Sequence, residues 1–206
     1  MTIAANARPG PREEGGTVID AATFDVLNAI YLRKMAPVPH IASVTELSEA
    51  QVSDLLQREL EEAAVLDMGG AFLLLEPGTA KVLAFYRGTY AALRAEGGIL
   101  RWYDKFETAL NQQFIRAVSE WQTSDGDDRA RDKMAKLVER MVRHLGQVVD
   151  EIPRYGKYAN RFERALALVD QGEQDFVCKP TVDSMHNVWF EFHEDILAVV
   201  GRPRDV

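Results

Sequence analysis

Residues 48–75 read SEAQVSDLLQRELEEAAVLDMGGAFLLL, which predicts a helix followed directly by a β-hairpin. Ser48 and Gln51 have the spacing of a capping box, in which two side chains satisfy backbone N–H groups at a helix start. Apolar residues then recur at helical spacing: Val52, Leu55, Leu56, Leu60 and Ala63. Two apolar runs, residues 65–68 and 71–75, flank Gly69-Gly70, a pattern typical of two strands joined by a tight turn.

Two further helices are predicted before this stretch and one after it. The first begins near Ala21, and its apolar face consists of Phe24, Leu27, Tyr31 and Met35. Residues 38–44 form a short second helix, and Thr79 is expected to cap a helix over residues 80–95. Three helices followed by a hairpin is the element order of a winged helix-turn-helix. We therefore predict that residues 19–96 form a winged-helix domain with a two-stranded wing.

The predicted third helix has the wrong charge for reading DNA. In a DNA-binding protein of this fold that helix lies in the major groove, between phosphates. Here its only cation is Arg58, and the hairpin over residues 65–75 contains no Arg or Lys. The acids on the same helix are Glu49, Asp54, Glu59, Glu61 and Glu62. A duplex would repel this surface, so the sequence disfavours DNA binding by these two elements.

The bulk composition is that of a globular protein, with 47% hydrophobic and 27% charged residues in a chain of 206. The net charge of −8 divides into −5 for residues 1–96 and −3 for residues 97–206, so neither half has the cationic excess usual in nucleic-acid binders. Cys178 is the only cysteine, which suits a reducing compartment, and no apolar run is long enough to cross a membrane. We expect a cytoplasmic protein in which residues 1–18 form a disordered tail.

The second half is predicted to be entirely helical. Helical patterns alternate with short polar loops, which favours an antiparallel four-helix bundle over residues 97–202. Gly97-Gly98 marks its boundary with the first domain. The helices are expected over residues 99–121, 129–152, 155–169 and 175–200, with Pro180 either inside the first turns of the last helix or dividing it. The fold class is therefore mainly α, a winged helix followed by a bundle.

The densest group of reactive side chains lies within residues 183–195. A metal site would use Asp183, His186, His193 and another acid, but seven helical residues separate the two histidines by roughly 10 Å. That separation is too large for one zinc ion, although one of them could combine with His144. In the other interpretation both histidines border an apolar core with solvated acids nearby, and the residues concerned are Trp189, Phe190, Glu191, Glu194 and Asp195.

A second group is cationic and lies on one stripe of the predicted third bundle helix. It consists of Arg154, Lys157, Arg161 and Arg164, with Tyr155 and Tyr158 beside it. Such a stripe could hold a phosphate, a nucleotide or an acidic protein surface. The alternative is a set of ion pairs with acids close in sequence, such as Asp150, Glu151 and Glu163.

Motifs of enzymatic chemistry are missing. No glycine-rich loop joins a strand to a helix, and no Gly-x-Ser-x-Gly turn is present. Cys178 stands next to Lys179, which could lower the pKa of the thiol, but an isolated cysteine is more often a small core residue. We predict no catalytic residue, cofactor or bound metal, and a protein that is not an enzyme.

Two family resemblances add to these predictions. The hairpin, the following residues 75–79 and a long helix resemble the wing and next helix of MarR-type winged-helix proteins, over about residues 21–95. Residues 152–155, 158–161 and 180–194 resemble the helical region associated with PEP-utilising, pyruvate phosphate dikinase-like proteins. The second resemblance implies a phosphotransfer enzyme as partner. It transfers no catalytic role, because these helical residues have no assigned catalytic role in that family.

Three functions are therefore compared. The first is a non-enzymatic regulatory or accessory module whose acidic winged helix serves protein interaction or dimerisation. The second is a DNA-binding transcriptional regulator, which would need cations from elsewhere, such as Arg33, Lys34 and Arg87 or Arg8 and Arg12 in the tail. The third is a small-molecule or metal-dependent activity at His186 and His193. We favour the first, and expect a homodimer by analogy with winged-helix proteins that carry helical extensions.

Overall fold

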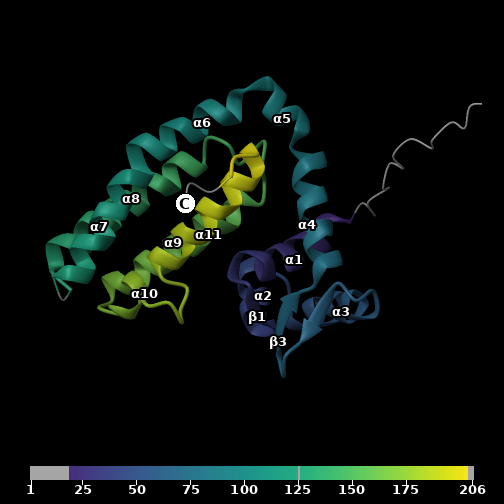
Figure 1. The fold of residues 1–206 in the computed structure, drawn as a ribbon. Coiled ribbons are helices and arrows are strands. Elements are labelled where there is room, and N and C mark those ends of the chain that lie inside the picture. Colours follow the sequence, from purple (N-terminus) through teal and green to yellow (C-terminus); the bar gives the residue numbers. More distant parts are fainter. Residues whose placement is uncertain (1–18, 125, 204–206) are drawn as a thin grey trace, which may run out of the picture.

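The computed structural model describes residues 19–124 and 126–203. Within this part the chain is mainly helical, with one small antiparallel sheet of three strands (Figure 1). The tail predicted over residues 1–18 lies outside the described residues. No helix within the described ranges is long and apolar enough to span a lipid bilayer.

The first seven elements occupy residues 21–89. They are α1 (Ala21–Arg33), β1 (Met35–Pro37), α2 (Val38–Thr45), α3 (Glu49–Glu61), β2 (Val65–Asp67), β3 (Ala71–Leu74) and α4 (Glu76–Thr89). The capping box at α3 is confirmed, since Ser48 Oγ accepts from Gln51 N at 3.3 Å and Gln51 Oε1 accepts from Ser48 N at 3.0 Å. Asp20 caps α1 in a similar way, by accepting a hydrogen bond from Thr23 N at 2.8 Å.

The predicted two-stranded hairpin is present as β2 and β3, but the sheet has a third strand, β1, that the sequence did not predict, in the order β1-β3-β2. The missed strand contains Met35, which the helical spacing had placed on the first helix. Lys34 adopts a positive φ of 71°, and α1 ends at Arg33, two residues before Met35. The chain then runs extended alongside β3, with Met35 opposite Leu73. Helical periodicity could not show this, because Met35 lies at the next position of the same apolar pattern.

Helix α4 starts earlier than predicted. It begins at Glu76, with Pro77 in its first turn, whereas the sequence suggested a cap at Thr79. Proline suits this position because its fixed φ is helical and the first turn does not need its N–H group. Gly78 allows the first turn to pass close to the end of α3, since a Cβ there would lie 2.2 Å from the carbonyl oxygen of Ala64.

The remaining elements are helical, as predicted. They are α5 (Ala91–Glu96), α6 (Gly98–Phe106), the π-helical turn η1 (Glu107–Asn111), α7 (Gln112–Thr123), α8 (Asp128–Leu145), α9 (Tyr155–Asp170), α10 (Asp175–Cys178) and α11 (Met185–Val200). Gly97 ends α5 with a φ of 73°. Pro180 follows α10 and separates it from α11, which starts where Ser184 accepts a hydrogen bond from Asn187 N at 3.3 Å.

Three predicted helix lengths need correction. The helix expected over residues 80–95 is divided at Tyr90 into the end of α4 and α5. The helix expected over residues 99–121 is interrupted by η1, and the one expected over 129–152 ends as an α-helix at Leu145 and continues through turns. The apolar face of the former is nevertheless buried, from Trp102 through Phe106, Leu110 and Phe114 to Ala117. The π-turn adds a residue without moving this face away from the core.

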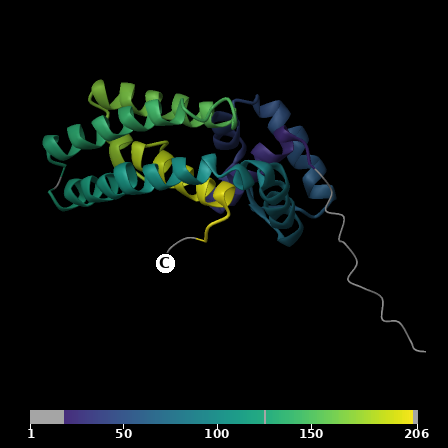
Figure 2. The same cartoon turned by 90° about the horizontal axis from the view of Figure 1, so that it is seen from above.

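A single apolar core connects both halves of the described chain. Helix α11 lies at its centre and packs against α9, α6 and α8 on one side and against α1 and α4 on the other (Figure 1). Seen from above, α7, α8, α9 and α11 run alongside one another while the N-terminal elements lie at one end of them (Figure 2). Arg94 reinforces this junction, because its guanidinium donates to the carbonyl oxygens of Val199 and Tyr86.

Candidate functional site

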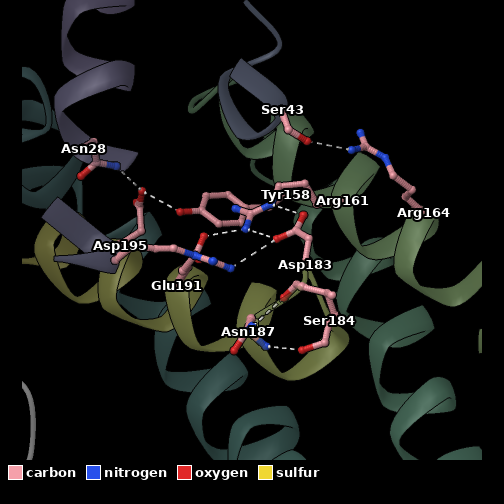
Figure 3. A network of polar contacts seen from close by, with 12 residues as sticks. Asn28, Ser43, Tyr158, Arg161, Arg164, Asp183, Ser184, Asn187, Glu191 and Asp195 are labelled. Carbon is pink, nitrogen blue, oxygen red and sulfur yellow. Dashed lines mark hydrogen bonds and ion pairs between the residues drawn. The ribbon is translucent and has the colours of Figure 1, made fainter. Parts of the chain in front are cut away.

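The largest group of buried charges lies where the N-terminal helices meet α9 and α11 (Figure 3). At its centre is Asp195 of α11, whose side chain has no exposed surface. The carboxylate receives two hydrogen bonds from the Arg154 guanidinium, one of them at 2.5 Å. Three further donors complete its surroundings: Asn28 Nδ2 at 3.1 Å, Tyr155 Oη at 3.1 Å and Tyr158 Oη at 3.2 Å.

Tyrosines extend these contacts to α4. Tyr86 Oη donates to Asn28 Oδ1 at 2.8 Å, and Tyr90 Oη accepts from Arg154 Nε at 2.9 Å. Burial, followed by the negative charge of Asp195, raises the pKa of Tyr86 well above its ordinary value. The hydroxyl therefore stays protonated and acts as a donor. One carboxylate thus holds together side chains from α1, α4, α9 and α11.

Arg161 forms a second centre on α9. This buried guanidinium donates to both carboxylate oxygens of Asp183, at 2.6 and 2.9 Å, and to Glu191 Oε2 at 2.5 Å. The other oxygen of Glu191 accepts from Arg33 Nε of α1, also at 2.5 Å. Burial alone would raise the pKa of Asp183, but the hydrogen bonds and charge of Arg161 outweigh it and lower the pKa. Glu191 therefore bridges cations from the two halves.

The two remaining residues of the predicted cationic stripe also face the N-terminal half. Lys157 Nζ lies 2.5 Å from Asp25 Oδ2 of α1, and Arg164 Nη1 donates to Ser43 Oγ of α2 at 3.3 Å. The structure thus places all four predicted cations against other parts of the fold. Their partners are distant in sequence, and the neighbouring acids suggested as partners, Asp150, Glu151 and Glu163, are exposed.

The interpretation of Glu191 and Asp195 as solvated acids was wrong. Their residues are only 4% and 0% exposed. The reason is that α11 is covered by other helices around most of its circumference, so the face that carries residues 191 and 195 meets Arg161 and Arg154 instead of water.

These contacts form what we call the ionic network, which has equal numbers of cations and anions. Its cations are Arg33, Arg154, Lys157 and Arg161, and its anions are Asp25, Asp183, Glu191 and Asp195. His40 of α2 borders it. Burial first, and then the charge of Arg33, lower the pKa of His40 to about 4, which leaves its imidazole neutral at pH 7.

The space inside the ionic network is small. A cavity of about 40 Å³ lies between Asn28, Thr45, Lys157 and Glu191. That volume accommodates water but is far below the size of pockets that hold organic ligands. Chemically, the ionic network can fix the two halves relative to each other and respond to protonation. Every carboxylate in it already has a cationic partner.

The other predicted site residues do not form one cluster, because each contacts different neighbours. Trp189 stacks on Phe114, with ring centroids 3.9 Å apart, and donates from Nε1 to Asn111 Oδ1 at 2.9 Å. His193 Nε2 lies 3.2 Å from Glu107 Oε2. His186 is turned toward α10, where burial lowers its pKa and a hydrogen bond with the Cys178 backbone opposes that shift.

The described residues contain no group of three or more His, Cys, Asp or Glu side chains that could hold a metal ion. His144 stacks on Trp102, with centroids 4.2 Å apart, and does not join the other histidines in such a group. Cys178 is half-buried, and burial raises the pKa of its thiol to about 11, opposite to the effect that Lys179 could have had.

Sequence reasoning missed Asn28, Arg33, Tyr86, Glu191 and Asp195 as members of one site. A weak signal existed for Asn28, which stands inside the apolar run of the first helix and needs a polar partner once buried.

No protein-family model matches this chain, and searches of curated proteins and of solved structures find no match either.

Proposed function

We propose that this protein is a non-enzymatic regulatory or accessory module, a winged helix followed by a helical bundle, that docks onto another protein through an acidic α3. The element order α1-β1-α2-α3-β2-β3 supports the winged-helix interpretation, because a helix-turn-helix precedes a hairpin that packs back on it. The helices from α6 to α11 supply the proposed bundle. The MarR-like and PEP-utilising resemblances are consistent with these two parts.

The observation that carries the proposal is the charge on the solvent side of α3. Its exposed acids are Glu49, Asp54, Glu61 and Glu62. Arg58 is the one exposed cation between Glu49 and Glu62. The fifth acid, Glu59, is buried and lies 2.6 Å from Lys81 of α4. Lys81 also lies 2.6 Å from Glu62 and so offsets the charge of that acid, which leaves Glu49, Asp54 and Glu61 as the exposed acids without this partner.

The outer face of the sheet beside α3 is apolar. Met35, Leu73 and Leu66 stand opposite one another across the three strands. Met35 is 52% exposed, Leu66 43% and Met68 57%, whereas Ala36 and Phe72 on the inner face are buried. Adjacent apolar and acidic surfaces fit a protein partner that presents apolar side chains next to Arg, since aromatic residues, Met and Arg are enriched at protein interfaces.

The sequence suggested cations outside α3 and the hairpin for DNA contact, and one of them is already paired with an acid. Arg33 is engaged with Glu191 in the ionic network. Lys34 and Arg87 are exposed, and Lys34 lies over the Tyr31 ring. Arg8 and Arg12 lie outside the described residues. A DNA-binding regulator is therefore the second candidate, and it depends on cations other than those of α3 and the hairpin.

A homodimer stays a prediction. Helix α11, the terminal helix on which the analogy relied, buries ten of its residues within its own chain. A dimer formed by pairing of this helix would first have to expose that core. The sheet face is the more suitable surface for a protein contact of any kind.

The experiment measures binding to a PEP-utilising phosphotransfer enzyme encoded in the same genome, using the two purified proteins. We expect saturable binding at micromolar concentration that weakens as salt rises, because opposite charges attract across the interface. The variant Glu49→Gln/Asp54→Asn/Glu61→Gln should bind about tenfold more weakly.

The matched control neutralises three exposed acids of the helical half, Glu139→Gln/Asp150→Asn/Glu163→Gln. It should bind like the wild type. Equal weakening by the two triple variants would show a non-specific charge effect and contradict docking through α3. If the wild type fails to bind at micromolar concentration, the assignment of this partner class is wrong.

A further inference from the structure

A groove of about 440 Å³ lies between the α6–η1 segment and α8, away from the ionic network. Its polar lining consists of Lys105, Arg140, Arg143, His144 and Gln147, and its apolar lining of Ala109 and Leu110. This volume is within the range of pockets that bind small organic molecules.

The cations of this groove lack acidic partners. No carboxylate is among the lining residues, and within the described ranges Lys105, Arg140 and Arg143 form no ion pair closer than 4.0 Å. Arg140 instead donates to neutral oxygens, Gln113 Oε1 at 3.3 Å and the Ala109 carbonyl at 3.5 Å. Three positive charges thus converge on one concave surface of a protein whose net charge is −8.

The wall opposite α8 is the π-helical turn. Ala109 and Leu110 belong to η1, and π-turns inside α-helices are frequent at functional sites. His144 also lines the groove and is stacked on Trp102 with an interplanar angle of 11°. Its Nε2 atom is buried and has no hydrogen-bond partner among the described residues. The groove therefore offers three cations to a ligand, whereas this buried nitrogen is not accessible from it.

We propose that this groove binds a small phosphorylated molecule, with its phosphate between Arg140, Arg143 and Lys105 and its organic part over Ala109 and Leu110. A phosphate monoester has nearly two negative charges and three free oxygens, which suits two guanidinium groups and an ammonium group. A carboxylate, with one charge and two oxygens, is satisfied by a single arginine. This inference is independent of docking through α3.

The test is calorimetric titration of the full chain with phenyl phosphate, inorganic phosphate and benzoate at constant ionic strength. We expect phenyl phosphate to bind saturably with a Kd below about 1 mM. Inorganic phosphate should bind more weakly, because it lacks the apolar part, and benzoate more weakly still. If benzoate binds as tightly as phenyl phosphate, the ligand class is wrong.

Variants locate the site. Arg140→Gln/Arg143→Gln should weaken phenyl phosphate binding at least about tenfold, because it removes both charge-assisted contacts. The matched control, Arg116→Gln/Lys136→Gln, removes the same charge from exposed positions outside the groove and should leave the Kd unchanged.

The His144 ring signals in an NMR titration give a second readout, and they should shift as the wild type saturates. The proposal is overturned if the wild type shows no saturable binding, if both double variants lose affinity equally, or if the His144 signals stay still at saturation.

Discussion

Asp195 is a single buried carboxylate that accepts hydrogen bonds from several parts of this fold. It is fully enclosed, and its main partner, Arg154, is nearly so, with side-chain exposures of 0% and 11%. Exchanging a buried ion pair for apolar groups is often harmless, but removing one partner leaves an unpaired charge away from water. Removing the charge of Asp195 would therefore leave the Arg154 guanidinium buried without a counter-charge, and this lowers the stability of the folded chain.

We predict that Asp195→Asn lowers the free energy of unfolding by about 3–5 kcal/mol. The amide keeps the shape of the side chain but removes the charge that compensates Arg154, and it presents two N–H groups to neighbours that are themselves donors. Urea denaturation followed by circular dichroism measures the change. Asp150→Asn, at an exposed position, is the control and should stay within about 0.5 kcal/mol of the wild type. A similar small effect for Asp195→Asn would show that the ionic network contributes little.

For the ionic network, the sequence revealed which residues are charged but not which of them form pairs. The cationic stripe on α9 is visible as Arg154, Lys157, Arg161 and Arg164. Its partners are far away along the chain, since Lys157 and Asp25 are separated by 132 positions and Arg33 and Glu191 by 158. Local spacing contains no information on contacts that only the packing of α1 against α9 and α11 creates.

Among the secondary-structure elements, most differences between prediction and structure lie at the ends of helices. The start of α3 was predictable because a capping box is a local motif, with donor and acceptor three residues apart. Strand β1 was not predictable, because its three residues become a strand only by pairing with β3. The π-turn η1 likewise left the apolar spacing of its helix intact, so the sequence showed a continuous helix.

We predict that Ser48→Ala lowers the free energy of unfolding by about 1 kcal/mol. The change removes the hydroxyl that accepts from Gln51 N, and so leaves an N–H group at the start of α3 without its intramolecular partner. Chemical denaturation of the two proteins gives the difference. Ser53→Ala, which alters an exposed serine inside the same helix, should not destabilise, since alanine is a good helix former. Equal losses at both positions would contradict a specific role of the cap.

The ionic network makes the stability of the whole molecule depend on pH through His40. Its pKa is about 4 in the folded chain against 6.5 for an ordinary histidine, because burial and the charge of Arg33 disfavour the imidazolium. Between these values the unfolded chain binds a proton that the folded chain does not. The contribution of His40 is therefore fully present above pH 6.5 and is lost as the pH falls toward 4.

We predict that the wild type loses about 1.4 kcal/mol of unfolding free energy per pH unit from this histidine near the middle of that window. His40→Gln cannot take up the proton, so its stability should fall less steeply with decreasing pH. Denaturation curves of both proteins across the window test this. Parallel pH profiles would show that His40 titrates alike in the folded and unfolded chains.

The distribution of charge over the described residues separates the acidic surface of α3 from a cationic groove. The exposed acids of α3 lie in the N-terminal half, whereas Lys105, Arg140 and Arg143 lie between α6 and α8. The sequence indicated the first surface correctly in sign, because α3 is a local element with a readable outer face. It could not indicate the second, which requires two helices to face each other.

The most direct measurement is fluorescence anisotropy of a labelled mixed-sequence DNA duplex titrated with the full chain, across a salt series that begins at about 50 mM. If α3 is a protein-docking helix, no saturable binding occurs even at the lowest salt, since its carboxylates repel phosphates. Saturable binding whose affinity falls steeply with increasing salt would contradict the account, because it would require a cationic surface positioned to contact the DNA backbone.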